Sequence, residues 1–367
     1  MSAGFDDFTC NDLVSQIDST IKSKLQEHGS DTKAAIFGHP FPDPDSIGSQ
    51  MGLAWLLAKK YQIESDLYFE GEISHPQNSA IINLLELNLI PAQNDYQIGK
   101  YSLNFLVDTT PKNLDGVSDV PWDLVIDHHK ENQLPNFDGH FLHRKIGSCS
   151  AILVELISSL QEKDQDLWFS QQSDYDRQVA TGLMAGIATD TEHNMSMDAT
   201  DGDFHAYNRL YPYRLPLVLK DIIYYKRPKS WVDMISRASN EAVVDTEGFA
   251  IVGLGMVSEK NRDVVPYVAD EMIKWASVEA AVAFAVVGCN KLVGCVRSGN
   301  ASVSVNDLCK KLGGTFGSGG AKLGKGSYNY GFGGLCFDPD DEADHNNNLW
   351  LAIKHREISR ITKTIKG

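Results

Sequence analysis

The chain has 367 residues, of which 42% are hydrophobic and 22% charged. This length exceeds one ordinary hydrophobic core and predicts two domains, each large enough to bury a core of its own. Asp and Glu number 49 against 33 Lys and Arg, so the formal charge of −16 should repel long nucleic acid. A small phosphorylated ligand is still compatible, because bound divalent ions and a few local cations can reverse the field inside one cleft.

The cysteines and the first residues indicate the compartment. None of the six cysteines forms a Cys-x-x-Cys pair, which favours free thiols in a reducing environment. The N-terminal residues are acidic and lack the basic and then apolar order of a signal peptide, and no apolar run reaches membrane-spanning length. We therefore expect a cytoplasmic protein that does not bind membranes.

Residues 34 to about 223 alternate short apolar or β-branched runs with stretches of helical periodicity. This alternation is typical of a doubly wound α/β domain, in which helices cover both faces of a mostly parallel sheet. The predicted strands cover 34–37, 103–107 and 124–126, and the predicted helices cover 47–59, 150–161 and 178–187. Ligands of such sheets bind at the carboxyl ends of the strands.

The regular alternation breaks in a segment rich in Tyr, Leu, Pro and Lys, and we place the connection between domains there, at 216–235. This predicts a first domain over 1–215, a smaller α/β domain over 236–345 and a C-terminal helix over 346–367. The strands expected in the second domain cover 249–254, 280–287 and 292–296, and the helices cover 263–274 and 305–312. The glycine-rich segment 313–334 should form a loop, and 338–344 an acidic turn.

Candidate metal ligands follow the predicted strands of the first domain. His39, Asp43 and Asp45 lie directly after the first strand, in a segment that three prolines should keep non-helical. Asp108 ends the second strand, and the triplet Asp-His-His at 127–129 ends the third. Imidazole and carboxylate groups bind Mn²⁺, Mg²⁺ and related ions, and the carboxyl ends of parallel strands converge on one crevice.

Asp190 ends the apolar run 184–189, which we count as a fourth strand end. A single Asp after a strand is usually a helix N-cap, and a single His is usually structural. Four such ends together are hard to explain by capping and favour a site for two ions. Two ions about 3.5 to 4 Å apart can share a carboxylate and a bridging hydroxide that attacks phosphorus. The expected chemistry is metal-dependent hydrolysis.

The motif at 38–49, taken together with the triplet at 127–129, resembles the DHH phosphoesterase superfamily. The resemblance covers nearly the whole chain and implies two divalent ions, with Mn²⁺ expected and Mg²⁺ or Co²⁺ as alternatives. It implies that Asp108 is shared by both ions. The other ligands that it implies are His39 and Asp43 for one ion, and Asp45, His128 and Asp190 for the second.

The resemblance also implies catalytic roles for Asp108, Asp127 and His129. His129 would face the scissile phosphate, and Asp127 would orient the imidazoles, as carboxylates behind metal-bound histidines usually do. Ser148 and His193 are candidate substrate contacts in the same domain. Ser148 precedes a predicted helix, so a role as N-cap is the stronger expectation for it.

The second domain resembles the DHH-associated domain that closes over substrate in nanoRNases and dinucleotide phosphodiesterases. The substrate contacts that this resemblance implies are Arg297, Ser298, Gly319, Gly320 and Lys322. Arg suits a bidentate grip on phosphate, although an exposed Arg often forms only a surface ion pair. Ala321 stands where the family carries a His that recognises the nucleotide.

The resemblance implies a phosphodiesterase that cleaves short oligoribonucleotides, or linear dinucleotides such as pGpG and pApA, to mononucleotides. The enzymatic alternatives are hydrolysis of cyclic dinucleotides, of 3′-phosphoadenosine 5′-phosphate or of polyphosphate. An alternative of another class is a sensor that binds a nucleotide without turnover. Family members often dimerise, so a homodimer is also an expectation.

Overall fold

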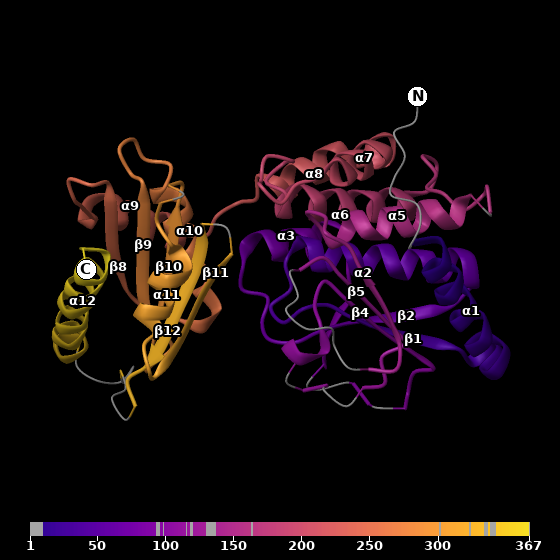
Figure 1. The fold of residues 1–367 in the computed structure, drawn as a ribbon, viewed down its shortest axis with the longest axis horizontal. Helices are drawn as coiled ribbons and strands as arrows, with labels where there is room; N and C mark the ends of the chain where they lie inside the picture. Colours follow the sequence, from indigo (N-terminus) through magenta and orange to yellow (C-terminus); the bar gives the residue numbers. More distant parts are fainter. Residues whose placement is uncertain are drawn as a thin grey trace. The chain divides into compact units, whose positions relative to one another are not determined.

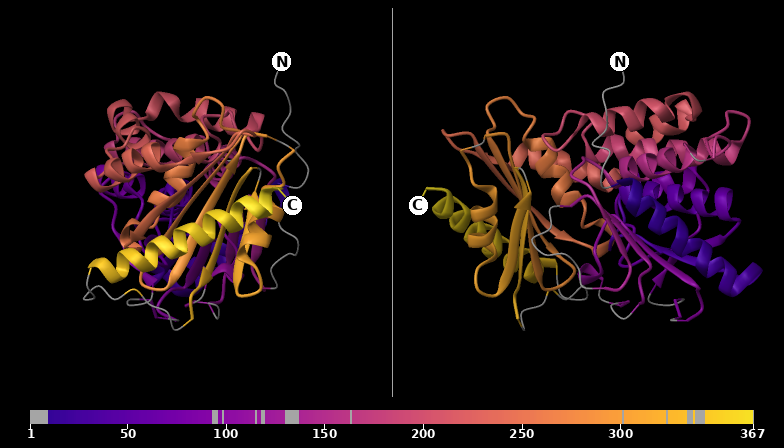
Figure 2. Two further views of the ribbon diagram at one scale, coloured as in Figure 1. Left: turned by 90° about the vertical axis from the view of Figure 1, so that its left-hand side faces the viewer. Right: turned by 45° about the vertical axis from the view of Figure 1, so that its right-hand side comes forward.

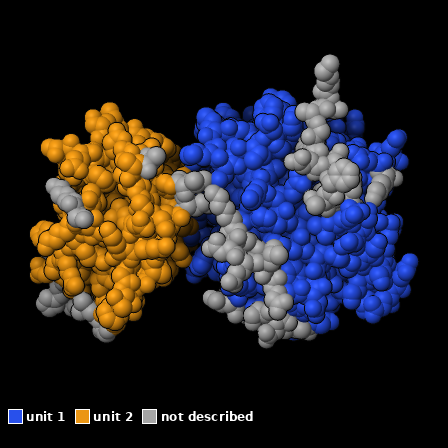
Figure 3. Space-filling view, in the orientation of Figure 1, with its two compact units in different colours: residues 1–226 blue, residues 227–367 orange. Residues whose placement is uncertain are grey.

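The computed structural model describes residues 10–92, 96–97, 99–114, 116–117, 120–129, 137–162, 164–300, 302–322, 324–333, 337 and 343–366. The chain folds as two compact units, unit 1 (Met1–Lys226) and unit 2 (Arg227–Gly367), which Figures 1 and 3 show in different colours. The division falls inside the segment 216–235. That segment is largely helical, because it contains α8 (Pro216–Ile223) and the first residues of α9 (Lys229–Glu241).

Unit 1 contains a six-stranded parallel sheet with the order β3-β2-β1-β4-β5-β6. The strands are β1 (Lys33–Phe37), β2 (Glu64–Phe69), β3 (Leu89–Pro91), β4 (Leu103–Val107), β5 (Leu124–Asp127) and β6 (His140–His143). Since β1 pairs with both β2 and β4, the strand order reverses at β1, and ligands of open α/β sheets bind at such a point. The predicted doubly wound fold is confirmed.

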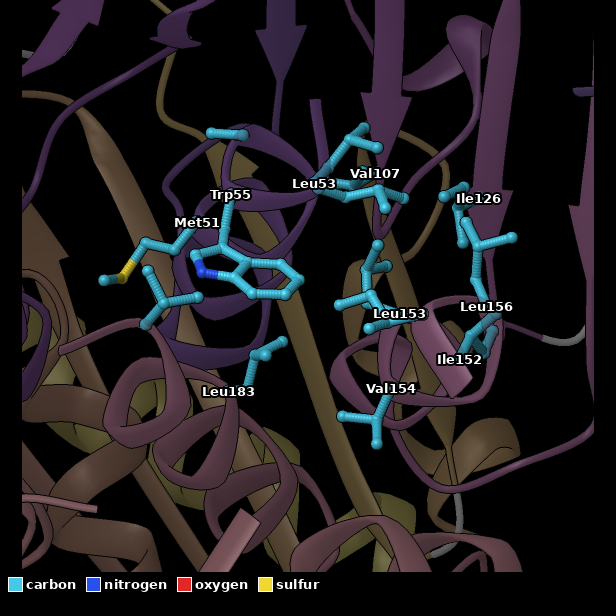
Figure 4. Close-up of a cluster of buried hydrophobic side chains, with 14 of the residues drawn as sticks. Met51, Leu53, Trp55, Val107, Ile126, Ile152, Leu153, Val154, Leu156 and Leu183 are labelled. Atoms are coloured by element: carbon cyan, nitrogen blue, oxygen red, sulfur yellow. The ribbon is translucent and has the colours of Figure 1, made fainter. Parts of the chain in front are cut away.

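Helices cover the sheet of unit 1, and the sheet has an apolar cluster on each face. The helices are α1 (Cys10–His28), α2 (Pro44–Leu56), α3 (Pro76–Leu84), α5 (Cys149–Gln161), α6 (Asp174–Asp190), α7 (Asp201–Leu210) and α8. Figure 4 shows part of the larger cluster, which includes Leu53 and Trp55 of α2, Leu153 of α5, and Val107 and Ile126 of the sheet. Successive strand residues point to opposite faces, so the neighbouring Leu106 and Val125 belong to the smaller cluster.

Unit 2 contains a second six-stranded sheet, with the order β11-β12-β10-β9-β8-β7. Its strands are β7 (Val243–Val244), β8 (Phe249–Val257), β9 (Ala280–Val287), β10 (Lys291–Ser298), β11 (Gly317–Lys322) and β12 (Lys325–Gly331), and its helices are α9, α10 (Val264–Met272), α11 (Val305–Gly313) and α12 (Ala343–Lys366). Only the pair β8 and β9 is parallel in this sheet. Helix α12 lies across one face of it, as Figure 2 shows.

The prediction of a loop over 313–334 is wrong. Most of this segment forms the antiparallel hairpin of β11 and β12. Its glycines allow strand and helix to approach closely, because a Cβ atom on Gly319 would overlap the carbonyl oxygen of Cys309 in α11. Of the predicted acidic turn, 338–342 lie outside the described residues. Among the helices of the described part, none has the length and apolar character needed to cross a membrane.

Candidate metal centre

The segment after β1 places three predicted ligands at the start of α2. Asp43 is the N-cap of this helix, where its Oδ1 accepts hydrogen bonds from the amides of Asp45 (2.9 Å) and Ser46 (3.0 Å). Pro44 is the first helical residue, a position that proline favours because its missing amide hydrogen is not needed there. The expectation of a wholly non-helical segment is therefore wrong for Asp45, which lies buried in the first turn of α2.

Asp108 lies between two imidazoles. It follows β4 with a φ of +61°, a left-handed conformation that is uncommon outside glycine and clusters at functional sites. Its buried carboxylate has one oxygen on each side: Oδ2 lies 3.6 Å from Nε2 of His39, and Oδ1 lies 3.4 Å from Nε2 of His128. One carboxylate therefore lies beside two sets of ligand atoms.

The structure brings all six predicted metal ligands together. His39, Asp43 and Asp108 form one group of ligand atoms, in which His39 Nε2 lies 3.4 Å from Asp43 Oδ1. In the second group, His128 Nε2 lies 3.2 Å from Asp190 Oδ2 and 4.0 Å from Asp45 Oδ2. These two groups match the ligand sets that the family resemblance implies, with Asp108 beside both. A third group of ligand atoms joins Asp108 to His128 and His129.

The expectation that Asp190 ends a strand is wrong, whereas the helix predicted over 178–187 is confirmed by α6. Asp190 is the last residue of α6, where the helix macrodipole disfavours a carboxylate. The apolar run before it is helical, and short apolar runs do not distinguish strands from helices. A cation nearby would offset this unfavourable interaction, and the position of Asp190 Oδ2 3.2 Å from His128 Nε2 fits a shared ion.

Hydrogen bonds to backbone carbonyls fix the tautomers of the imidazoles of His39 and His128. His39 Nδ1 donates to the carbonyl oxygen of Pro40 (2.7 Å), and His128 Nδ1 donates to that of Ile146 (3.0 Å). When each ring is neutral, its Nε2 therefore carries a lone pair that faces the carboxylates. Within the described chain, His128 Nε2 and Asp108 Oδ1 are buried and make no hydrogen bond. Unsatisfied nitrogen and oxygen donors behind fixed tautomers fit a divalent cation.

The electrostatics of the cluster also fit a cation. Burial lowers the pKa of His39, but the charges of Asp43 and Asp108 outweigh it and raise the pKa to about 10. Burial likewise opposes the charged form of His128, yet its contacts with Asp108 and Asp190 raise its pKa to about 12. Burial and the charges of Asp108 and Asp190 raise the pKa of Asp45. The buried carboxylates thus favour positive charge between them, and bound divalent ions can supply that charge in place of protons on the imidazoles.

His129 lies on the open side of the cluster. Its Nδ1 donates to Asp127 Oδ1 (2.8 Å), and its side chain is 45% exposed. The same oxygen accepts from the backbone amides of His128 (2.9 Å) and His129 (3.3 Å). Asp127 therefore orients the ring of His129 but not that of His128, which Ile146 holds. This corrects the expectation that Asp127 orients both imidazoles.

A pocket of about 410 Å³ opens beside His129. The residues that line it are His39, Pro40, Asp108, Thr109, Thr110, Lys112, Asn113, Asp127 and His129. Thr109, Thr110, Lys112 and Asn113 were not predicted. They lie in the segment that follows β4 and begins with Asp108, which includes the 3₁₀ turn Pro111–Asn113. Their position directly after a strand-end Asp was the available signal in the sequence.

Comparison with known proteins identifies the domain that carries this cluster. Residues 33–187 match the model of the DHH family, N-terminal domain. Unit 1 therefore carries a DHH family domain. The chain is 26% identical over 299 residues to an uncharacterized protein of Methanocaldococcus jannaschii, covering 81% of this chain and 58% of that protein.

Two further relatives of the DHH domain have named activities. The cyclic-di-AMP phosphodiesterase PdeA of Listeria monocytogenes is 24% identical over 293 residues, which cover 76% of this chain and 42% of PdeA. A probable manganese-dependent inorganic pyrophosphatase of Deinococcus radiodurans is 27% identical over 183 residues, or 48% and 53% of the two chains. The chain thus spans about half the length of the curated relatives it matches. An exopolyphosphatase-related protein of Bacteroides fragilis shares the fold, with a TM-score of 0.61 at 13% identity over 98% of this chain and 100% of that one.

Two predicted substrate contacts of the DHH domain lie outside these groups. Ser148 is fully buried: its hydroxyl donates to Asp203 Oδ1 (2.8 Å) and accepts from the amide of Ala151 (3.3 Å), so it caps α5. This geometry argues against a substrate contact for Ser148. His193 is exposed just beyond α6, and its backbone amide donates to the carbonyl of Ala188 (2.7 Å).

In unit 2, the structure places Arg297 and Gly320 in a pocket of about 530 Å³. Its lining residues are Arg262, Asp263, Pro266, Lys291, Val293, Cys295, Arg297, Gly320, Ala321, Lys325, Gly326, Ser327, Tyr328 and Asn329. Arg297 forms a two-pronged ion pair with Asp270 of α10, with distances of 2.5 and 3.2 Å. The guanidinium of Arg297 therefore lines the pocket while it is paired with Asp270. The residues around Arg297 in the sequence did not indicate this ion pair.

The other predicted contacts of unit 2 lie elsewhere. The Ser298 hydroxyl is 3.2 Å from the carbonyl oxygens of both Glu279 and Asn300, and Gly319 packs against α11. Gly320 differs from Gly319, because a Cβ atom at that position would meet nothing within 4 Å. The side chain of Lys322 lies outside the described residues.

Proposed function

We propose that this protein is a metal-dependent phosphodiesterase that hydrolyses short oligoribonucleotides or linear dinucleotides, such as pGpG and pApA, to mononucleotides. The observation that carries the proposal is the position of Asp108, whose Oδ2 lies 3.6 Å from Nε2 of His39 and whose Oδ1 lies 3.4 Å from Nε2 of His128. Divalent ions bound there would polarise a phosphoryl oxygen and lower the pKa of water, which makes phosphate esters hydrolysable at neutral pH.

The side chains around the pocket have separate roles in this proposal. His129, with Nδ1 held by Asp127, presents Nε2 toward the open side, where it can contact a phosphate oxygen or transfer a proton to the leaving oxygen. Lys112 is exposed where it lines the pocket and can pair with a second phosphate oxygen. Neither role requires a nucleophilic side chain, because water is the attacking group.

The choice of a short substrate rests on charge and on the pocket of unit 2. The chain has a net charge of −16, which opposes binding of long polyanions. Arg262, Lys291 and Lys325 nevertheless line the unit 2 pocket together with Arg297. A volume of about 530 Å³ lies within the range of roughly 300–1,000 Å³ that small-molecule sites occupy. A few phosphates beside a base fit this chemistry better than a long strand.

Hydrolysis of a cyclic dinucleotide is the second candidate, because the relative from Listeria monocytogenes is a cyclic-di-AMP phosphodiesterase. We propose Mn²⁺ as the ion, since oxygen and imidazole ligands suit it and the relative from Deinococcus radiodurans is described as manganese-dependent. The alternatives of 3′-phosphoadenosine 5′-phosphate, polyphosphate and a nucleotide sensor remain hypotheses that one experiment separates.

The experiment incubates the purified full chain with Mn²⁺ and matched amounts of pGpG, pApA, longer RNA oligomers, cyclic dinucleotides and 3′-phosphoadenosine 5′-phosphate, and follows products by chromatography. Inorganic polyphosphate is a parallel sample. We expect mononucleotides from the dinucleotides, with rates that fall as the RNA lengthens. Turnover confined to a cyclic or 3′-phosphorylated nucleotide, or to polyphosphate, would replace the substrate, and nucleotide binding without any product would favour the sensor.

A further inference from the structure

The turn at 146–150 contacts two ligands of the proposed second ion site at once. The carbonyl oxygen of Ile146 fixes the tautomer of His128, as described above. Three residues later, the first amides of α5 bind Asp45: Cys149 donates to Oδ2 (2.7 Å) and Ser150 donates to Oδ1 (2.9 Å). The orientation of the Asp45 carboxylate and of the His128 ring therefore both depend on where this turn lies.

Asp203 of α7 accepts hydrogen bonds from this turn. Its side chain is fully buried, and its Oδ2 accepts from the amide of Gly147 (2.8 Å) while Oδ1 accepts from the hydroxyl of Ser148 (2.8 Å). Oδ2 also accepts from the amide (2.9 Å) and hydroxyl (2.8 Å) of Thr200, the N-cap of α7. A capping box uses only the contact with the N-cap. The two bonds to the turn are additional.

The turn has little room to move relative to Asp203. A Cβ atom on Gly147 would lie 2.8 Å from Asp203 Oδ2 and 2.7 Å from Thr191 Cγ2. A buried carboxyl group is disfavoured unless hydrogen bonds satisfy it, so the four donors and the side chain of Asp203 stabilise each other. A change of charge at residue 203 should therefore shift the turn.

We propose that Asp203 is a positioning residue for the second ion site, acting through the turn at 146–150 on Asp45 and His128. The inference rests on the proposed metal-dependent function. Asp203 contacts neither ligand itself. Loss of an outer partner of a metal ligand commonly weakens metal affinity 10- to 100-fold. Among the described residues, His39 and Asp43 of the first ion site make no hydrogen bond to this turn. This site shares Asp108 with the second one, so its affinity should change less than that of the second site.

Asp176 provides a matched control. Like Asp203, it is a buried Asp at the third position of a helix, and it accepts hydrogen bonds from the amide of Ser170 (2.8 Å) and from Nε1 of Trp55 (2.9 Å). Its helix, α6, approaches the cluster near its other end, at Gly186 and Asp190, about 15 to 20 Å away at 1.5 Å per residue. Asp176→Asn should lower stability without changing the cluster.

The experiment titrates Mn²⁺ alone into the metal-free full chain by calorimetry and electron paramagnetic resonance, with thermal unfolding of each variant as the measure of fold. We expect two Mn²⁺ in the wild type, a dissociation constant about tenfold higher at one of the two sites in Asp203→Asn, and wild-type values at both sites in Asp176→Asn. Gly147→Ala changes the same contact from within the turn, because its Cβ atom would lie 2.8 Å from Asp203 Oδ2. This variant should repeat the effect of Asp203→Asn, and it replaces Asp203→Asn in the test if Asp203→Asn does not fold.

Two results would overturn the inference while leaving the proposed function intact. One is wild-type Mn²⁺ affinity at both sites in a folded Asp203→Asn variant. The other is an equal loss of affinity in Asp176→Asn, because that would reflect general destabilisation. A wild-type protein that binds no Mn²⁺ would instead overturn the proposed function and this inference together.

Discussion

Asp108→Asn removes the charge that both proposed ion sites share and changes the shape of the side chain very little. The residue has a φ of +61°, and Asn adopts this left-handed conformation more readily than most side chains, so the backbone of the variant should be preserved. The substitution leaves a neutral amide between the Nε2 atoms of His39 and His128. We expect it to abolish both Mn²⁺-dependent turnover and tight Mn²⁺ binding.

The magnitude follows from linkage between binding and folding. A ligand at 100 times its dissociation constant stabilises the folded state by about 2.7 kcal/mol per site. For a unit of the size of Met1–Lys226, this corresponds to a rise of roughly 5–11 °C in Tm for one site. The wild type should show at least this rise in thermal unfolding when Mn²⁺ is added, and Asp108→Asn should lose it.

Asp123→Asn is the control for this experiment. Asp123 directly precedes β5, at the opposite end of the strand from Asp127, and its Oδ2 accepts from the amide of Asn104 (2.8 Å). This variant can change the Tm of the metal-free protein, but its rise on adding Mn²⁺ should equal that of the wild type. If Asp108→Asn kept the Mn²⁺-dependent rise in Tm and turned over substrate within a few-fold of wild type, the shared-ligand assignment would be refuted.

Two predictions concern unit 2. Gly319→Ala should lower the free energy of unfolding by about 1–3 kcal/mol or more, because its Cβ overlaps Cys309, whereas Gly320→Ala faces open space and should be nearly neutral in the same urea titration. Glu357→Ala should cost about 3 kcal/mol or more, because this buried carboxylate of α12 pairs with Arg360 and accepts from two tyrosine hydroxyls. Wild-type unfolding of the Glu357 variant would contradict that role.

The sequence predicted best those elements that are apolar throughout. β4 and β5 are buried on both faces, so each reads as a short and mostly apolar run, and the polar residue that ends the run marks a ligand position. This is why Asp108 and the residues after β5 could be assigned without a structure. The same reasoning wrongly placed Asp190 at the end of a strand, because a run of small apolar residues is also compatible with a buried helix.

Interactions between distant segments could not be predicted. Arg297 of strand β10 pairs with Asp270 of helix α10, and Asp203 binds a turn 55 residues earlier in the chain at Ser148. Neither partner stands in a local pattern, and an Asp three residues after a Thr predicts only a helix cap. The hairpin at β11 and β12 was missed for a related reason: its glycines serve contact with α11 and leave no alternation of apolar side chains to recognise.

The occupied N-terminus of α5 bears on how an anionic substrate can bind to unit 1. A helix N-terminus is an obvious site for phosphate, but here its first amides are hydrogen-bonded to the carboxylate of Asp45. The cluster itself brings several carboxylates together and would repel a phosphate at close range. Positive charge would therefore come from the ions and from Lys112. We accordingly expect metal to bind first, because only the loaded cluster presents a field that attracts the phosphate.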